Sequence, residues 1–193
     1  MDEPVIDTTN RSLGIRRGTV HLTEHDPRWA SVGAATVSEI ADATGIPRDR
    51  VQHVGSTSVP GLTAKPILDI VLGVSDADSI DAVAGDLVSL GYLDRGGSGG
   101  ASSSIGRLIV RESLPDVRTV HVHIVEHGTD AWGDYVEFRD ALRSDLSLRD
   151  QYAEVKRKLA RDFPEDRTSY RHAKNAFIRS TLSTLRARKG GGG

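Results

Sequence analysis

The sequence of 193 residues contains no cysteine. This absence excludes disulfide bonds, catalytic thiolates and zinc held by cysteine. A surplus of one charge is also missing, because 25 lysines and arginines stand against 27 aspartates and glutamates, for a net charge of -2. Proteins that bind the nucleic-acid backbone carry a basic field, so we expect no nucleic-acid partner. Small charged substrates remain compatible with this balance.

Long apolar runs are absent as well. No stretch approaches the roughly 20 apolar residues that span a membrane, and the first four residues are not the basic start of a secretory signal. We therefore expect no membrane contact and a cytoplasmic location. The length fits one domain and leaves the oligomeric state open.

Flexible segments are expected at both ends and in one loop. Residues 1–17 show no periodicity and predict a loose N-terminal arm, followed by a domain over residues 18–188. Residues 189–193 read Lys-Gly-Gly-Gly-Gly and predict a flexible tail. Residues 96–104 are all Gly, Ala or Ser, so we expect a mobile surface loop there, with a lid as the less favoured alternative.

The rest of the sequence carries strand and helix patterns. Apolar, β-branched runs predict strands at residues 51–55 and 67–74, and residues 105–111 and 118–126 predict a hairpin. Apolar residues at helical spacing predict helices at residues 27–43, at about 76–90, and over most of the chain from residue 130 onward. The pattern is typical of an α+β fold with helices on one face of the sheet and a C-terminal helical segment.

The most informative segment covers residues 51–74. Its first strand ends in a turn of small residues, Gly55, Ser56, Thr57 and Ser58. Lys65 follows, and the next strand carries one acid, Asp69. Free backbone amides, hydroxyls and a lysine are what a triphosphate needs, and the acid can hold its divalent ion. The alternatives are a plain turn, a solvated Lys65, and a buried ion pair of Asp69 with Lys65 or Arg107.

Two histidines lie in the second strand of the expected hairpin. Period-two alternation sends His121 and His123 to one face and the apolar residues around them to the other. This spacing lets two imidazoles converge on one ion. Together with Asp69 they suit Mn²⁺, Fe²⁺ or Zn²⁺ at least as well as Mg²⁺, and His53 is also available from the earlier strand. Hydrogen bonds to phosphate or to carboxylates are the alternative use of the pair.

Basic side chains elsewhere are candidates for binding an anion. Alternation in the hairpin places Arg107 and Arg111 on the histidine face, and we expect Arg107 to bind phosphate. Lys174 shares a helix face with Tyr170, so both can point toward the pocket, although a lysine on the helix surface is the alternative. Arg111 and Arg118 flank the hairpin turn, which is also typical of plain surface charges.

The stretch His53-Val-Gly-Ser-Thr-Ser-Val-Pro-Gly-Leu, followed by Lys65-Pro66, resembles the signature of the GrpB family, also called UPF0157. The resemblance covers most of residues 18–185, and its further matches are Arg107, Arg111, residues 118–123, Tyr170, Lys174, Phe177 and Ile178. The segment is also similar to the nucleotidyltransferase superfamily of polymerase-beta-like fold, whose metal strand reads acidic-hydrophobic-acidic. Here that strand reads Asp69-Ile70-Val71, so the second acid is replaced.

The resemblance implies a mixed sheet of nucleotidyltransferase topology and transfer of a nucleotidyl group from a nucleoside triphosphate, such as ATP, to a small-molecule acceptor. The implied cofactor is a divalent metal ion, Mg²⁺ or Mn²⁺, with Zn²⁺ and Fe²⁺ as further options. The metal ligands would be Asp69, His121 and His123, which are catalytic candidates together with Lys65. The nucleotide-binding candidates are Gly55, Ser56, Thr57, Ser58, Arg107 and Lys174.

Two other classes of function stay open. A non-catalytic descendant of the fold would keep the pocket for a ligand or a partner, and the fusion of GrpB-like domains to dephospho-coenzyme A kinases links it to coenzyme A metabolism. A metal-dependent hydrolase of a small phosphorylated compound would use the Asp69, His121 and His123 site with water as nucleophile. Val71 helps to distinguish these classes. The loss of a metal carboxylate at this position weakens the case for a transferase, unless Glu112 or Glu126 supplies a second acid.

Overall fold

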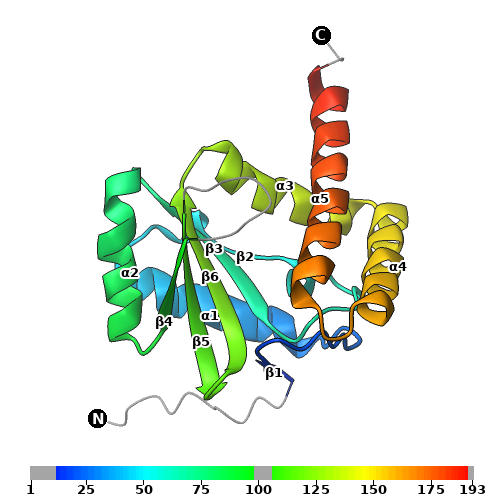
Figure 1. Ribbon diagram of the computed structural model, residues 1–193. Helices are drawn as coiled ribbons and strands as arrows, with labels where there is room; N and C mark the ends of the chain where they lie inside the picture. The colour runs from blue at the N-terminus through cyan, green and yellow to red at the C-terminus, as the bar shows by residue number, and fades with distance from the viewer. Residues whose placement is uncertain (1–11, 98–105, 191–193) are drawn as a thin grey trace.

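A mixed sheet of six strands forms the centre of the protein (Figure 1). The structure is a computed structural model that describes residues 12–97 and 106–190. Five strands follow the order β2 (Val51–Val54), β3 (Leu68–Val74), β6 (Val117–Glu126), β5 (Arg107–Leu114) and β4 (Leu93–Gly97), and β1 (Ile15–Arg16) pairs with β6 outside this path. Among these pairs, β3 and β6 run parallel and the others antiparallel. The α+β class is confirmed.

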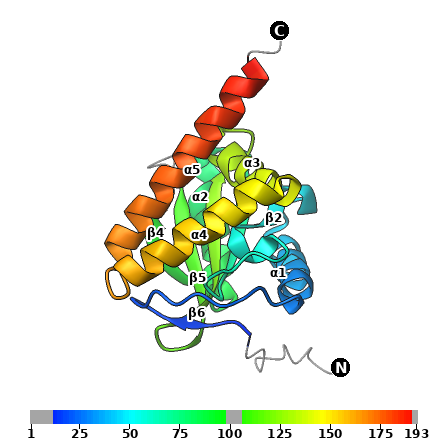
Figure 2. The same ribbon diagram turned by 90° about the vertical axis from the view of Figure 1, so that its right-hand side faces the viewer.

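Helices cover both faces of the sheet, as Figures 1 and 2 show. On one face lie α1 (Arg28–Thr44) and α2 (Ile80–Ser89), and on the other α3 (Asp130–Ser144), α4 (Leu146–Asp162) and α5 (Arg167–Gly190). Short 3₁₀ turns are η1 (Arg48–Arg50), η2 (Ser56–Ser58) and η3 (Ala77–Ser79). The prediction of helices on one face is wrong, because the central strand β3 is buried along almost its whole length and both its faces need cover.

The sheet face covered by α1 and α2 packs against these helices in an apolar core. Its strand residues are almost fully buried and pack against apolar side chains of the two helices: Ile70, Leu72, Val120, Val122 and Ile124 from the sheet, Trp29 and Ile40 from α1, Val83 and Leu87 from α2. Gly45 ends α1 in the left-handed conformation, with φ at 66°, which glycine adopts without strain. This core fixes the register of β3 against β6, and with it the positions of side chains on the opposite face.

The opposite face carries two smaller apolar clusters. Val54, Val71 and Val125 pack against α3, and the connection between β2 and β3 contributes Val59 and Leu62 to a cluster shared by α3, α4 and α5. Within that second cluster the rings of Tyr152 and Phe177 stack at a centroid distance of 5.3 Å. The three C-terminal helices are therefore held over the β2–β3 connection, which contains the small-residue turn.

The N-terminal segment is more ordered than the sequence predicts. β1 pairs with Val117 and Arg118 of β6, and Gly14 N–H donates to the Pro66 carbonyl at 2.8 Å. Residues 12–17 therefore belong to the folded body, while residues 1–11 lie outside the described residues. At the other end, α5 reaches Gly190 in place of a tail from residue 189. The predicted mobile loop at 96–104 falls mostly outside the described residues, apart from the last part of β4.

A β-bulge changes the alternation of β6. Arg111 pairs with Val120 and Glu112 pairs with Arg118, so Thr119 is an extra residue in β6. Arg118 therefore shares a face with His121, whereas strict alternation would put it on the other side. The prediction that Arg107 and Arg111 lie on the histidine face is wrong, because the register pairs Leu108 with His123 and Val110 with His121.

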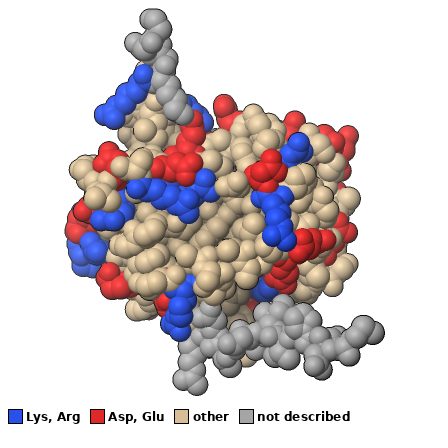
Figure 3. Space-filling model, turned by 180° about the vertical axis from the view of Figure 1, so that it is seen from behind, with Lys and Arg blue, Asp and Glu red and all other residues tan. Residues whose placement is uncertain are grey.

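Surface charge is mixed on the face seen from behind in Figure 3, where acidic and basic side chains are interspersed around uncharged surface. This distribution agrees with the near-neutral balance of the whole chain. No helix of the described residues is long and apolar enough to cross a membrane.

Candidate functional site

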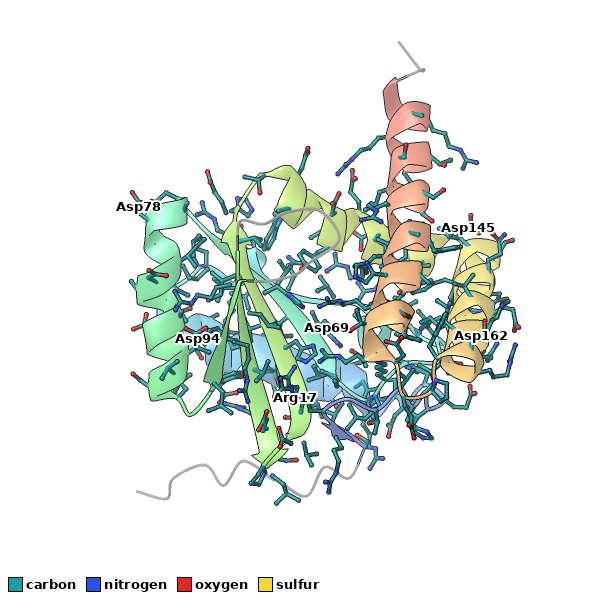
Figure 4. All side chains as sticks on the ribbon, in the orientation of Figure 1. Arg17, Asp69, Asp78, Asp94, Asp145 and Asp162 are labelled. Atoms are coloured by element: carbon teal, nitrogen blue, oxygen red, sulfur yellow. The ribbon has the colours of Figure 1, made fainter. Side chains whose placement is uncertain are left out.

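Three polar side chains meet where β3 and β6 lie side by side. The parallel register pairs Asp69 with His121 and Val71 with His123, so Asp69 and both imidazoles share one face. His121 Nδ1 lies 3.3 Å and His123 Nε2 lies 3.5 Å from Asp69 Oδ1. One ligand atom of each residue lies within 4.8 Å of the other two. The structure thus brings together the three metal ligands that the sequence suggests, between the sheet and α5 (Figure 4).

The charge states of this trio suit a divalent ion. Burial raises the pKa of Asp69, but the hydrogen bonds and charges of His121 and His123 outweigh it and hold that pKa well below its usual range. Burial also lowers the pKa of His121, and Asp69 offsets only part of this shift. At neutral pH the carboxylate is therefore ionised and His121 is neutral, which are the forms that bind metal ions.

The donor set is one oxygen and two nitrogens, which fits Mn²⁺, Fe²⁺ or Zn²⁺ better than Mg²⁺. Both imidazoles direct a nitrogen at the same carboxylate oxygen, and a bound ion would replace the protons between them. The outer nitrogens, His121 Nε2 and His123 Nδ1, are buried and have no hydrogen-bond partner among the described residues. Ligating imidazoles usually donate this second N–H to an oxygen, so the trio lacks that support.

Gly55 makes room for the carboxylate. Its φ is 68°, and a Cβ atom at this position would lie 2.5 Å from Asp69 Oδ2. A side chain here would be strained and would also collide with Asp69. The glycine is therefore needed at the trio itself, in addition to any close approach of a phosphate.

The hydroxyls that follow Gly55 have different surroundings. Ser56 and Thr57 line the cavity, but Ser58 does not and donates to the Gly55 carbonyl at 2.7 Å. Thr57 Oγ1 donates to the Ile67 carbonyl at 3.1 Å and lies 3.0 Å from His53 Nε2. Of the three predicted hydroxyls, only that of Ser56 is held toward the cavity without being used in the turn.

Lys156 of α4 holds Ser56, and the sequence did not single it out. Its side chain is 2% exposed. The ammonium donates to Ser56 Oγ at 3.1 Å and to the Thr63 carbonyl, and lies 4.7 Å from the centre of the Tyr152 ring. Burial lowers its pKa well below the usual value, and the charges of Lys174 and Arg157 add to this shift.

A cavity of about 280 Å³ opens over the trio. Its lining carries eight lysines and arginines but only two carboxylates, Asp69 and Asp134, and Asp134 is paired with Arg186. In a chain with a net charge of -2, this cavity concentrates positive charge and favours an anionic ligand.

Two of these cations lie close to the trio. Lys65 is held with its ammonium 4.4 Å from the centre of the Tyr170 ring, and burial together with the charges of Lys174 and Arg167 lowers its pKa to about 8. Burial also lowers the pKa of Lys174, which the charge of Asp69 raises in part. Neither lysine has a carboxylate within ion-pair distance among the described residues, so both are available to an anion.

Several predicted residues are not brought to the cavity. Arg107 pairs with Asp94 and Asp81 at the β4 side of the sheet and does not line the cavity, and Arg111 pairs with Glu39. His53 faces α1, where a Cβ atom on Gly33 would lie 2.3 Å from its Nδ1, and it cannot join the trio. Lining residues that the sequence did not single out as site candidates include Arg17, Tyr135, Lys156, Arg167 and Arg171, and Arg118, for which a plain surface charge was the alternative, also lines the cavity.

The position of the missing second acid is closed. Val71 is fully buried, with Trp132, Tyr135 and Val136 of α3 packed against its cluster. Glu112 pairs with Arg95 at 2.9 Å, and neither Glu112 nor Glu126 lines the cavity. Asp69 is therefore the only carboxylate of the trio, and the other carboxylate that lines the cavity, Asp134, is paired with Arg186.

Comparison with known proteins gives the family of the chain. The family described as "GrpB protein" matches residues 19–184. A UPF0157 protein of Streptomyces coelicolor is 40% identical over 159 residues, which cover 82% of this chain and 80% of that protein. A more distant match is a dephospho-CoA kinase of Mycolicibacterium paratuberculosis, 26% identical over 86% of this chain but only 46% of the kinase.

The fold also has a relative of known structure. The crystal structure of the conserved protein GrpB from Enterococcus faecalis is similar to this chain with a TM-score of 0.65 and 25% identity, over 84% of this chain and 99% of that one. The family match extends from the segment after β1 to the middle of α5, and so includes Asp69, His121 and His123. The chain therefore belongs to the GrpB (UPF0157) family.

Proposed function

We propose that the protein is a divalent-metal-dependent enzyme that transfers a nucleotidyl group from a nucleoside triphosphate to a small acceptor. One observation carries the proposal: an ionised carboxylate and two imidazoles converge at the floor of a cavity whose remaining charges are almost all positive. An ion held there and the surrounding cations are what a polyphosphate substrate needs.

The residues have distinct roles in this proposal. Asp69, His121 and His123 hold the ion, which would polarise a phosphoryl oxygen when bound. Lys65 and Lys174 balance the charge of the phosphates, and Ser56, held by Lys156, offers its hydroxyl and amide to them. A lysine whose pKa is about 8, such as Lys65, gains stability as a cation when an anion binds beside it.

Hydrolysis of a small phosphorylated compound is the second candidate, and a specific observation favours it. The burial of Val71 under α3 leaves a single carboxylate, whereas two-metal nucleotidyl transfer relies on several carboxylates to balance the ions. A one-ion site that activates water needs only the trio. The third candidate is a binding protein without catalysis, and the match to part of a dephospho-CoA kinase makes ligands related to coenzyme A reasonable to test.

The first experiment tests the ion site. Calorimetric titration with Mn²⁺, Zn²⁺ and Mg²⁺ should show binding to the wild type that Asp69→Asn abolishes, because the amide keeps the shape and loses the charge. Asp42→Asn is the matched control, since Asp42 is exposed on α1 in a surface ion pair. Equal affinity in Asp69→Asn and the wild type would remove Asp69 from any metal role.

The second experiment separates the three functions. A nucleoside triphosphate with the bound ion should raise the melting temperature by stabilising the folded state. Pyrophosphate release that depends on an acceptor establishes transfer, and phosphate release without an acceptor establishes hydrolysis. Nucleotide binding without either product establishes the binding protein. If no nucleotide raises the melting temperature with any of the ions, nucleotidyl transfer is wrong.

A further inference from the structure

Besides Arg16, four arginines from three separate parts of the chain line the same cavity as the metal trio. Arg17 follows β1, Arg118 lies in β6, and Arg167 and Arg171 lie in the first turns of α5. We call Arg17, Arg118, Arg167 and Arg171 the arginine cluster. In Figure 4, Arg17 lies near the end of the sheet where β1 lies, and Asp69 lies between the sheet and α5. None of the four makes an ion pair with Asp69.

The cluster has almost no negative partner. Among the described residues, Arg17, Arg167 and Arg171 make no ion pair, and Arg118 Nε lies 3.7 Å from Glu112, which already binds Arg95 at 2.9 Å. Burial and the charges of Arg171 and Arg17 lower the pKa of Arg167. Burial and the charges of Arg167, Arg95 and Arg17 likewise lower the pKa of Arg118. The guanidinium groups are therefore close enough to repel one another.

Arg118 is the most buried residue of the arginine cluster. The bulge at Thr119 turns it to the cavity face, and it is only 5% exposed. Its Nε is buried and has no hydrogen-bond partner among the described residues. A buried N–H of a charged group without an acceptor costs free energy, and a repelling group of cations beside it adds to that cost. An anion in the cavity would satisfy both, because guanidinium groups bind carboxylate and phosphate with two parallel hydrogen bonds.

We propose that the arginine cluster is a second anion subsite, which holds a phosphate or carboxylate group of the acceptor. The nucleotide phosphates then lie at Lys65 and Lys174 near the ion, and the acceptor approaches from the side of β1 and α5. The acceptor is thus an acidic small molecule, such as a phosphate monoester or a carboxylic acid. The assignment of the ligand of the arginine cluster as the acceptor rests on the proposed function, whereas the anion subsite itself does not.

The test uses the full chain without metal, in EDTA and at low ionic strength, titrated separately with inorganic phosphate and with citrate. We expect binding to the wild type, with the tighter anion indicating which of the two groups the acceptor carries. The variant Arg167→Gln/Arg171→Gln should lose one bound anion, with affinity at the cluster weakened about tenfold or more. Arg179→Gln, which removes one positive charge from an exposed part of α5 outside the cavity, should bind like the wild type.

Two further measurements separate this subsite from the metal trio and from misfolding. Asp69→Asn should keep or improve anion binding, because it removes a negative charge from the same cavity. Without an added anion, Arg167→Gln/Arg171→Gln should melt at or above the wild-type temperature, because like-charge repulsion is relieved.

Three results would overturn the subsite: no anion binding to the wild type, unchanged binding to the double arginine variant, or loss of binding in Asp69→Asn. A wild type that fails to bind Mn²⁺ but binds phosphate through the cluster would instead contradict the proposed function and leave the subsite in place.

Discussion

The two faces of the sheet are built from alternate residues of the same strands, yet they treat histidine in opposite ways. On the α1 face, His53 lies 3.0 Å from Thr57 Oγ1, and the Thr57 proton is used by the Ile67 carbonyl, so His53 donates from Nε2. On the other face, His121 and His123 each keep one buried nitrogen without a partner among the described residues. The site histidines therefore combine partnerless buried nitrogens with a cavity, whereas the histidine of the α1 face is packed against Gly33.

The variant with the largest expected effect tests whether the site face can accommodate a second carboxylate at position 71. Val71→Asp would place a carboxylate in the apolar cluster under α3. We expect the free energy of unfolding to fall by about 4 kcal/mol, because a charge is buried. Urea denaturation measures the change.

Val71→Ala is the matched control for that variant, and its cavity should cost roughly 2 kcal/mol. If Val71→Asp were as stable as the wild type and bound Mn²⁺ more tightly, the acid position would still be open. The packing of α3 against Val71 would then not explain the lost carboxylate.

The next test adds one methyl group on each face of the sheet. Gly33→Ala would bring a Cβ atom to 2.3 Å from His53 Nδ1, and Gly55→Ala would bring one to 2.5 Å from Asp69 Oδ2. We expect Gly33→Ala to lower the free energy of unfolding by about 3 kcal/mol through overpacking, and to leave Mn²⁺ affinity near the wild-type value. Denaturation and calorimetry on the same samples give both quantities.

Compared with Gly33→Ala, Gly55→Ala should lower the free energy of unfolding less and weaken Mn²⁺ binding more. Strain at a φ of 68° costs about 1–2 kcal/mol, and the displaced Asp69 should weaken Mn²⁺ binding at least about tenfold. If Gly55→Ala bound Mn²⁺ like the wild type, the close approach of Gly55 to Asp69 would have no functional meaning. The glycine would then serve only the turn.

The sequence predicted the trio because its determinants are local. Asp69 interrupts an apolar strand, and alternation puts His121 and His123 on one face without any knowledge of the sheet order. Their convergence additionally needs β3 and β6 to be parallel neighbours, and this pairing comes from the structure. Most strands and helices were likewise found within a few residues of their observed bounds.

The rest of the site depended on features that no local pattern carries. Arg118 reaches the cavity through an extra residue at Thr119, and alternation alone would have assigned it to the wrong face. Lys156 lies within an apolar stripe of α4, where a lysine normally reaches the solvent, and only tertiary packing buries it against Ser56. Arg107 was misplaced because the pairing of β5 with β6 decides its face, and that register cannot be read from one strand.

The last test concerns the acid sensitivity of the α1 face. Burial lowers the pKa of His53 from 6.5 to about 4, and its free nitrogen, Nδ1, faces α1 at Gly33. Below pH 6.5 the unfolded chain therefore takes up a proton that the folded chain refuses, so stability is lost as the pH falls. Between pH 7 and pH 5 we expect His53 to contribute a loss of about 2 kcal/mol in the free energy of unfolding. Urea denaturation at several pH values should show a smaller loss in His53→Gln, which cannot take up a proton, than in the wild type. Equal losses in both would mean that His53 is protonated in the folded protein and that packing under α1 does not keep it neutral.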